Sequence, residues 1–591
     1  MDITRRTLLG AAAASGAGLL LPIGFPRQAT AQVRAGAAVF SEPLPTLTEL
    51  GVIDATAGGG AVIEMVNATH SFSSAIPPTP TFAYRGGSAM QSYLGPTIVA
   101  RQGVPFDLTM VSRLSSHPLA GAIDYGLDGV VQTDATDPRV STHLHGGNTS
   151  PANDGDPVDT FTRGHGPRVY HYANTQEAAG LWYHDHALAI TRLNVLAGLA
   201  GGYLIRNDDD PGDGSRRPDG SALPPAPDFE MPLILQDRSF NPDGTFLYPP
   251  NANPGTAGRP WAPEFFGDVA TVNGKAWPNL DVARGRYRFR VYNGSNARFY
   301  NLKFKGQDGT LTFHQIGSDG GLLNSPVALD KLLLGPGERA DIVVDFSASA
   351  PGTTVVLTND ARAPFPNGPR SARRGGMRLA AIMQFTVTSA AGWTVPLPSQ
   401  LRATPIASLA GASRPVSATR SMTLVENLNE FGSPLMALLN NRTFEAPGAT
   451  TVVGVDTLEQ WELINTTVDA HPIHLHFTQF QVLNRQKFDS AGYLTATYGA
   501  QPLPPDTGPF PPPPVDPFLR GGAKLPAPNE QGWKDTVVAM PGEVTRIMVP
   551  FGANAAGSVT AFQASFTGEY VWHCHILEHE DNDMMQRYAI A

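Results

Sequence analysis

The sequence predicts an all-β protein built from several β-sandwich domains. Short runs that alternate apolar and polar residues are common, as at residues 287–291, whereas segments with helical periodicity are scarce. The chain contains 61 glycines and 53 prolines, which interrupt these runs at frequent intervals. Its 591 residues are too many for one hydrophobic core.

A weak internal repeat indicates three domains. In each repeat a strand-like segment precedes a segment that contains histidine: 106–110 precedes 143–145, 287–291 precedes 314–316, and 460–464 precedes 471–476. We expect domains at 32–207, 229–388 and 420–591, joined by linkers at 208–228 and 389–419. The middle domain has the isolated His314 in place of paired histidines, and an isolated imidazole is more often structural than metal-binding.

Residues 1–31 have the pattern of a twin-arginine signal peptide. Arg5 and Arg6 precede an apolar stretch diluted by glycine and alanine, which ends in the cleavage pattern Ala29-Thr30-Ala31. No later run reaches 18 apolar residues. We therefore expect a soluble protein, not held in a membrane, that the twin-arginine export machinery delivers to the periplasm or the medium.

The net charge limits the possible binding partners, and the cysteine count bears on disulfide formation and metal binding. The formal net charge of −10 disfavours nucleic acid and anionic membrane surfaces. Cys574 is the only cysteine, so an intrachain disulfide is impossible. An exported cysteine that stays unpaired is better explained as a metal ligand than as a stray thiol.

The segment around Cys574 carries the strongest functional signal. Cys574 lies between His573 and His575, and His579 and Met584 follow. Neighbouring side chains on a β-strand point to opposite faces, so Cys574 would bind one metal while the two flanking histidines bind others. A thiolate with two imidazoles and a distant thioether forms the trigonal blue-copper site used in electron transfer. The segment therefore predicts electron transfer from one copper to a metal cluster.

Paired histidines occur in three further places. Random placement of 15 histidines predicts about 0.4 His-x-His pairs, and four are present. Both imidazoles of such a pair lie on one face of a strand, where they can bind a metal together. The pairs are His143/His145, His184/His186, His474/His476 and His573/His575. The alternative, four structural histidine pairs, does not account for this clustering.

From about residue 85 onward the chain resembles the multicopper oxidases, and most of all the branch that contains bacterial laccases, spore-coat laccases and bilirubin oxidases. Besides the histidine motifs, the segments 181–186, 272–275, 316–321 and 532–535 resemble that branch. The resemblance implies three cupredoxin-like Greek-key β-sandwich domains, with copper ligands in the first and third.

The resemblance also implies four coppers per chain and assigns their ligands. The type 1 copper would have His471, Cys574, His579 and, as a weak axial ligand, Met584; the type 2 copper would have His143 and His474; the type 3 pair would have His145, His184, His186, His476, His573 and His575. Each of the two ligand-bearing domains supplies two His-x-His pairs, so the cluster must lie at their interface. Asp185 occupies the position in the first domain that Cys574 occupies in the third, which excludes a second blue-copper site there.

The activity implied is laccase-like: one-electron oxidation of phenols and aromatic amines, coupled to reduction of O₂ to water. Glu580 and Asp154 resemble the acidic residues that supply protons in this family, although either could orient a ligand instead. On a strand or an extended turn, Glu580 would point away from the face that His579 uses.

Three questions stay open. A cuprous-ion oxidase for copper tolerance is one alternative, although the 13 methionines form no methionine-rich insert. A copper-free structural relative is another, although every ligand is present. The proline-rich segment 502–518 is either a lid near the type 1 copper or a surface excursion.

Overall fold

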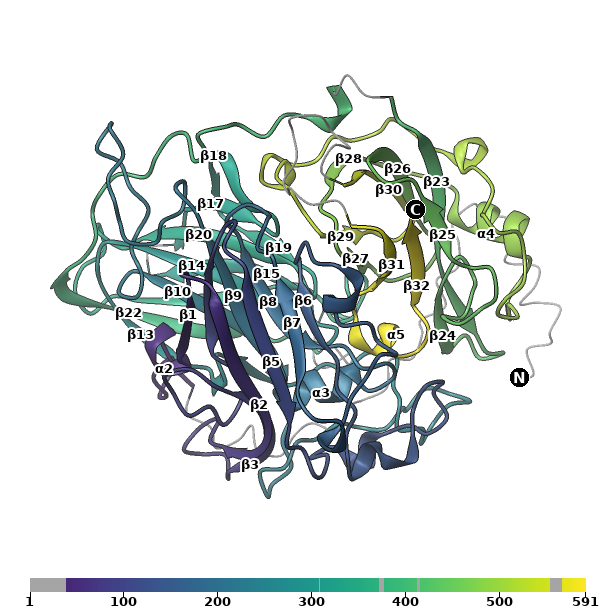
Figure 1. Cartoon of the computed structure of the whole chain (residues 1–591), viewed down its shortest axis with the longest axis horizontal. Coiled ribbons are helices and arrows are strands. Elements are labelled where there is room, and N and C mark those ends of the chain that lie inside the picture. Colours follow the sequence, from purple (N-terminus) through teal and green to yellow (C-terminus); the bar gives the residue numbers. More distant parts are fainter. Residues whose placement is uncertain (1–38, 308, 371–376, 412–414, 553–565) are drawn as a thin grey trace, which may run out of the picture.

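A computed structural model describes residues 39–307, 309–370, 377–411, 415–552 and 566–591. The proposed signal peptide, residues 1–31, lies outside the described residues. The predicted all-β class is confirmed, because strands dominate and assemble into three pairs of β-sheets, here called the first, second and third units (Figure 1). Within these described ranges no helix is long and apolar enough to cross a membrane.

The first unit contains β1 to β9 in sheets of order β1-β4-β9-β8-β6 and β3-β2-β5-β7. Consecutive strands cross between the sheets, so strands distant in sequence become neighbours; β1 pairs in parallel with β4. The strands are β1 (Val52–Ala55), β2 (Gly59–His70), β3 (Thr79–Arg85), β4 (Thr97–Arg101), β5 (Phe106–Ser112), β6 (Thr142–His145), β7 (Arg168–Tyr172), β8 (Gly180–Asp185) and β9 (Ala200–Arg206).

The second unit contains β10 to β22, with sheet orders β12-β11-β10-β14-β20-β17-β18 and β13-β22-β21-β15-β16. β19 pairs with β15. The strands are β10 (Glu230–Arg238), β11 (Val269–Val272), β12 (Lys275–Ala276), β13 (Asn279–Arg284), β14 (Arg286–Asn293), β15 (Tyr300–Gly306), β16 (Gly309–Leu311), β17 (Phe313–Ser318), β18 (Gly321–Leu329), β19 (Leu332–Leu334), β20 (Arg339–Asp345), β21 (Thr354–Asn359) and β22 (Ala381–Ala391).

The third unit contains β23 to β32, with sheet orders β24-β23-β26-β30-β28 and β25-β32-β31-β27-β29. The strands are β23 (Ala418–Leu428), β24 (Pro434–Leu439), β25 (Thr451–Val453), β26 (Thr457–Asn465), β27 (His471–Leu475), β28 (Gln481–Lys487), β29 (Thr536–Ala539), β30 (Glu543–Phe551), β31 (Gly568–Cys574) and β32 (Met585–Ile590). β22 and β23 both extend into the linker expected at 389–419, because strand pairing continues beyond the alternating part of the sequence.

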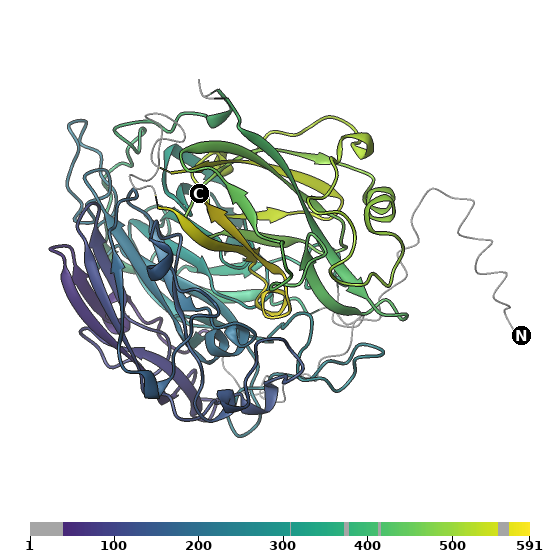
Figure 2. The same cartoon turned by 45° about the vertical axis from the view of Figure 1, so that its right-hand side comes forward.

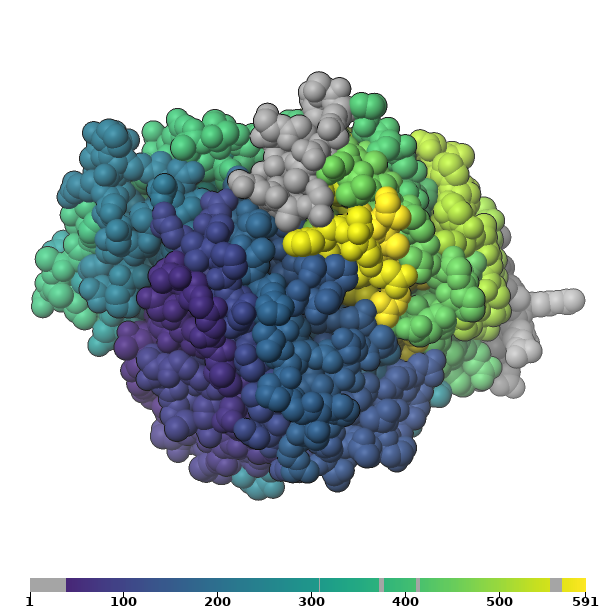
Figure 3. Space-filling model, viewed as in Figure 1, coloured from purple at the N-terminus to yellow at the C-terminus, as the bar shows by residue number. Residues whose placement is uncertain are grey.

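Helices are short, and all but α2, which precedes β1, lie between strands. They are α2 (Leu47–Leu50), α3 (Thr191–Ala197), α4 (Ser490–Tyr498) and α5 (Leu577–Glu580), with 3₁₀ turns η2 (Ala120–Ala122), η3 (Gln132–Ala135), η4 (Pro151–Asn153), η5 (Arg163–His165), η7 (Leu409–Gly411), η8 (Asp516–Phe518) and η9 (Pro528–Glu530). α3 of the first unit packs against α5 of the third. Both cartoon views place β31 and β32 beside the first unit, and the C-terminal residues form a seam against it in the space-filling view (Figures 1, 2 and 3).

Alternation in the sequence explains the half-buried strands. In β5, Phe106, Leu108 and Met110 are buried whereas Asp107 is exposed. The first and second units share one continuous apolar core, as the rings of Phe72 and Phe240 show at a centroid distance of 5.0 Å. The third unit has a separate core that contains Cys574 and Met584.

The alternation at 287–291 has a different outcome, because the polar residues Arg288 and Arg290 are also buried. Asp210, in the predicted linker, accepts hydrogen bonds from Arg288 at 2.6 and 2.8 Å and from Arg290 at 2.7 Å. Glu230 accepts a further bond from Arg290 at 2.9 Å. Buried charges are tolerated only when paired in this way, so these ion pairs fasten the linker to the second unit.

Candidate metal centre

The sulfur of Cys574 and two imidazoles converge inside the third unit. His471 begins β27, Cys574 ends β31, and His579 lies in α5. The His471 and His579 Nδ1 atoms lie 3.5 and 3.8 Å from Cys574 Sγ and 3.3 Å from each other. Thr467 Oγ1 contacts the opposite nitrogen of His471 at 2.7 Å, which leaves Nδ1 facing the sulfur.

Met584 is positioned beside this group by backbone bonds. Its carbonyl accepts a hydrogen bond from Cys574 N at 3.0 Å, and its N–H donates to the carbonyl of His579 at 2.9 Å. Met584 is fully buried in the same apolar cluster as Cys574. Met585 faces another cluster, with Phe444 and Val571.

The eight histidines of the four pairs form a second, larger group between the first and third units. Their ligand atoms fall into three sets within 4.8 Å: His143, His474 and His476; His145, His184 and His575; and His186, His476 and His573. Every set combines residues from both units, so the expected interface location is observed. His143 Nε2 lies 3.4 Å from His474 Nε2 across that interface.

Strand β31 separates the two groups as alternation predicts. His573 and Cys574 are neighbours on it, yet His573 Nε2 lies 3.2 Å from His476 and 3.3 Å from His186, whereas Cys574 faces His471 and His579. The backbone of β31 therefore connects a thiol site directly to the histidine cluster.

Both predicted carboxylic acids contact the cluster histidines. Asp154 Oδ2 lies 2.7 Å from His476 Nδ1, and the Asp154 carbonyl oxygen lies 2.6 Å from His143 Nδ1. Glu580 Oε2 lies 3.1 Å from His573 Nδ1, and Oε1 lies 3.6 Å from His186 Nδ1.

The expected local structure at Glu580 is wrong, although its expected direction is right. His579 and Glu580 lie in the short helix α5, not on a strand or an extended turn. Consecutive helical residues point about 100° apart, so the two side chains still diverge. His579 faces Cys574, and Glu580 faces the cluster.

Burial favours the neutral form of several of these imidazoles. Desolvation, together with the neighbouring imidazoles, lowers the pKa of His143, His184 and His573 well below the usual value, and burial lowers the pKa of His579 to about 3. A neutral imidazole has a free lone pair, the form that binds metal.

The acids respond to burial in the opposite way. Burial raises the pKa of Glu580 to about 7, against an opposing effect of His186 and His474, and it raises the pKa of Asp154 well above its usual value. Burial also raises the pKa of the Cys574 thiol, an effect that a bound cation would offset.

Comparison with known proteins shows the family. Models described as multicopper oxidase match residues 130–210, 227–372 and 414–591. The laccase of Bacillus subtilis is 38% identical over 547 residues, which covers 90% of this chain and 94% of the laccase. The chain belongs to the multicopper oxidase family.

Other multicopper oxidases resemble it over nearly its full length. The multicopper oxidase LPR1 of Arabidopsis thaliana is 36% identical over 569 residues, 93% of this chain and 92% of the relative. The crystal structure of a laccase from Pediococcus acidilactici superposes with a TM-score of 0.66 at 26% identity, covering 94% and 95% of the two chains. McoA from Aquifex aeolicus shares the fold, with a TM-score of 0.67 at 24% identity and coverage of 94% and 99%.

The donor set of this multicopper oxidase fits copper. One thiol, two Nδ1 atoms and a buried thioether suit a blue-copper site, and imidazoles suit the cluster. Several of these atoms have no hydrogen-bond partner in the described part of the chain, namely both ring nitrogens of His575 and Nδ1 of His186. Buried polar atoms are rarely left unpaired, so a missing partner such as a metal is indicated for His575.

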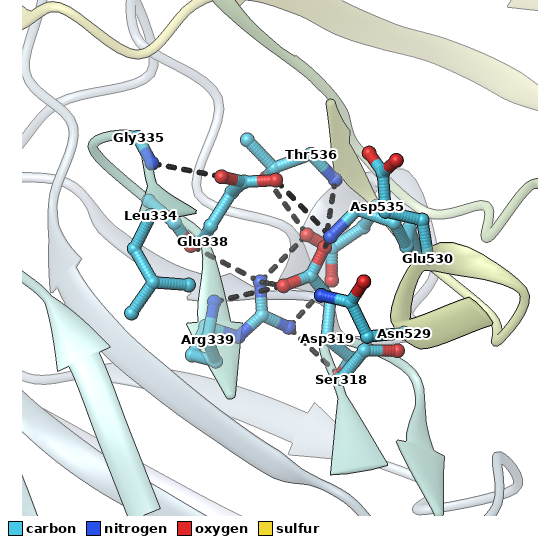
Figure 4. Close-up of polar contacts among 12 residues, drawn as sticks. Ser318, Asp319, Leu334, Gly335, Glu338, Arg339, Asn529, Glu530, Asp535 and Thr536 are labelled. Atoms are coloured by element: carbon cyan, nitrogen blue, oxygen red, sulfur yellow. Dashed lines mark hydrogen bonds and ion pairs between the residues drawn. The ribbon is translucent and has the colours of Figure 1, made fainter. Parts of the chain in front are cut away.

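Sequence reasoning missed an ion-pair network on the other side of the cluster. Asp535 lies beside His145 and His474. Arg339 of the second unit binds Asp535, and Figure 4 shows these two residues together. Burial would raise the pKa of Asp535, but Arg339 and His145 hold it well below its usual value. The segment 532–535 resembled the family, and a charged pair inside such a motif was the available signal.

A cavity of about 400 Å³ leads to the thiol site of this multicopper oxidase, and His579 forms part of its wall. Its apolar lining includes Pro249, Pro263, Phe266, Pro364, Met377, Leu428, Pro434 and Leu494. The carboxyl groups of Glu264, Glu426 and Asp469 also line it. Of the proline-rich segment and its flank, Gln501 contributes to the wall, which leaves the choice between lid and surface excursion open.

Proposed function

We propose that this multicopper oxidase is laccase-like and oxidises phenols and aromatic amines one electron at a time, with reduction of O₂ to water. The observation that carries the proposal is the cavity beside His579. Its volume of about 400 Å³ and its lining of proline, leucine and phenylalanine suit one aromatic ring. The Bacillus subtilis relative, itself named a laccase, supports the same donor class.

Four coppers per chain are part of the proposal. His471, Cys574, His579 and Met584 would hold the type 1 copper; His143 and His474 the type 2 copper; and the sets His145, His184, His575 and His186, His476, His573 one type 3 copper each. Bound copper would supply the redox chemistry, which collects single electrons and delivers four to O₂. The complete donor sets argue against a copper-free relative.

At the donor cavity, the electron and the proton released by a phenol would go to different groups. Oxidation of a phenol by one electron releases its hydroxyl proton, so a nearby base is required. Burial, followed by the charge of Asp469, raises the pKa of Glu426 to about 8, and burial raises that of Asp469 to about 7. Groups that titrate there can accept the proton near neutral pH, while the electron would pass by way of His579 to the copper that His471, Cys574 and His579 would hold.

On the oxygen side, Glu580 and Asp154 are proposed to hold protons. Both are buried against cluster histidines, and burial raises the pKa of both carboxyl groups, to about 7 for Glu580, which favours the protonated form that can supply a proton. They enter from opposite units, Asp154 from the first and Glu580 from the third.

Metal analysis, the visible spectrum and O₂ uptake test the proposal together. We expect four coppers per chain, an intense blue band, and four molecules of 2,6-dimethoxyphenol oxidised per O₂ consumed. Oxidation of only two molecules of the phenol per O₂, with release of hydrogen peroxide, would contradict four-electron reduction. A colourless protein that holds no copper would contradict the metal assignment.

A second donor class, small metal cations, is favoured by the three cavity carboxyl groups. Burial and the charges of Asp469 and Glu426 raise the pKa of Glu264, so a cation between these groups would relieve their repulsion. Carboxylate oxygens suit Fe²⁺ better than Cu⁺, and Met377 is the one thioether among the described lining residues.

The two donor classes can be separated in one variant. If cations are the donors, Glu426→Gln lowers kcat/KM for Fe²⁺ at least tenfold, and by more than it lowers kcat/KM for 2,6-dimethoxyphenol. If aromatic compounds are the donors, phenol oxidation by the unchanged protein far exceeds Fe²⁺ oxidation. Each substrate serves as the internal control for the other.

Export through the twin-arginine route to the periplasm or the medium is likewise proposed, on the basis of Arg5, Arg6 and the cleavage pattern at Ala29-Thr30-Ala31. Replacement of both arginines by lysine should retain the protein in the cytoplasm. Cell fractionation with an antibody against the protein tests this, and unchanged export would reject the route.

A further inference from the structure

Arg339 links the second unit, which provides none of the twelve proposed ligands, to the histidine cluster. It begins β20 and is 3% exposed. Its Nη1 and Nη2 donate to Asp535 Oδ1 and Oδ2 at 2.6 and 2.5 Å, the two-pronged geometry in which a guanidinium fixes a carboxylate (Figure 4).

Asp535 in turn meets one histidine from each side of the interface. Its Oδ1 lies 3.1 Å from His145 Nε2, and its backbone oxygen lies 3.0 Å from His474 Nδ1. Thr536 supports the same nitrogens, since its Oγ1 lies 3.0 Å from His145 Nε2 and 3.2 Å from His474 Nδ1.

These contacts involve the ring nitrogens that face away from the cluster. The inward nitrogens are His145 Nδ1, 3.4 Å from His184 Nε2, and His474 Nε2, 3.4 Å from His143 Nε2. An acceptor on the outward nitrogen keeps the proton there and leaves the inward lone pair free for a metal. Asp535 can therefore select the tautomer of both histidines.

The orientation of Arg339 is fully determined. Its five N–H donors reach Asp535 twice and the carbonyl oxygens of Gly180, Gly337 and Asp319 at 3.2, 3.2 and 3.0 Å. Gly180 belongs to the first unit, Gly337 and Asp319 to the second, and Asp535 precedes β29 of the third. All three units thus meet at one guanidinium.

Two glycines leave room for this arrangement. A Cβ atom at Gly146, the residue after His145, would lie 2.6 Å from both Arg339 Nη2 and Asp535 Oδ2. A Cβ atom at Gly337 would lie 2.7 Å from the ring of His575. The backbone before Arg339 therefore packs directly against the cluster imidazoles.

We infer that Arg339 is a positioning residue for the copper cluster, which acts through Asp535 to hold His145 and His474 in the metal-binding tautomer and orientation. The inference rests on the copper assignment proposed above. It gives the second unit a defined part in the oxidase, since Arg339 braces the place where a type 3 ligand and a type 2 ligand lie side by side.

Copper retention in variants tests the inference. Arg339→Met should weaken cluster copper about 10–100-fold, so that dialysis against a chelator that spares the unchanged protein removes the type 2 copper first. The type 2 electron paramagnetic resonance signal should shift or disappear, while the blue band of Cys574 persists. Arg339→Lys keeps the positive charge but cannot donate two parallel hydrogen bonds to Asp535, so it should give an intermediate loss of cluster copper.

Arg206→Met is the matched control. Arg206 is also buried and ion-paired, to Asp210 at 3.3 Å and Glu230 at 3.0 Å, but its partners are not cluster residues. Equal copper retention and identical type 2 signals in the Arg339 and Arg206 variants would overturn the inference. If Arg339→Met does not fold, Arg339→Lys decides the comparison. A protein that lacks cluster copper before any substitution would reject the proposed function instead.

Discussion

Replacing Glu580 by glutamine keeps the shape of the side chain and removes its titratable proton. With an ordinary pKa near 4.5, about 0.3% of the carboxyl groups would be protonated at pH 7, whereas the raised pKa of about 7 protonates about half. General acid–base catalysis contributes about 10²–10⁴-fold, so reoxidation of the reduced enzyme by O₂ should slow by that factor. Anaerobic bleaching of the blue band by a phenol should change less than about twofold, because Glu580 does not face the donor cavity.

The pH profile gives a second measurement of the same group. Because burial raises the pKa of Glu580, its protonated form prevails below about pH 7 and is lost above it. Copper bound to His186 and His573 would draw that midpoint lower. Reoxidation by the unchanged enzyme should therefore fall as the pH rises through this range, and the Glu580→Gln profile should be flat.

Glu578→Gln is the matched control for this experiment. Burial raises the pKa of Glu578 to about 7 as well, but its carboxylate accepts hydrogen bonds from Asn296 at 2.8 Å and Tyr248 at 3.2 Å. Both half-reactions should survive in that variant. Stopped-flow traces in which Glu580→Gln slows bleaching and spares reoxidation would refute the proton-supply role.

Three further outcomes are expected. Cys574→Ser should abolish the blue absorption and leave copper in the histidine cluster, as spectroscopy and metal analysis would show. Met584→Leu should raise the reduction potential of the type 1 copper by removing an electron-donating ligand, whereas Met585→Leu, which alters a separate apolar cluster, should not. A redox titration in which Met585→Leu shifts the potential and Met584→Leu does not would contradict Met584 as the axial ligand. Because its pKa is about 8, Glu426 gains charge as the pH rises, so KM for an anionic sulfonated donor should increase about three- to tenfold above pH 8, and Glu426→Gln should remove that increase in steady-state assays.

Local patterns in the sequence predicted the fold class and the convergence of histidines. Period-two alternation is a property of a single strand, and it placed His573 and Cys574 on opposite faces of β31 correctly. At Glu580 the same rule was applied to a segment that is helical. The direction survived because helical geometry also separates neighbouring side chains.

Contacts between distant segments were beyond local reasoning. Arg339 and Asp535 are 196 residues apart, and each alone resembles an ordinary surface charge. The carboxyl groups of Glu264 and Glu426 share one cavity although they lie in different units. Buried ion pairs depend on how whole units pack together, and the periodicity of apolar residues along the sequence does not reveal that packing.

The solitary thiol has a practical consequence. Cys574 is the one cysteine of the chain, is fully buried, and lies in the apolar core of the third unit. A thiol reagent can therefore modify this protein at a single atom, and only when the core around β31 opens. In metal-free protein, the rate of thiol labelling would measure how often the core opens, as amide hydrogen exchange does for backbone groups. The residue proposed to hold the blue copper would thus also report how often the core of the third unit opens.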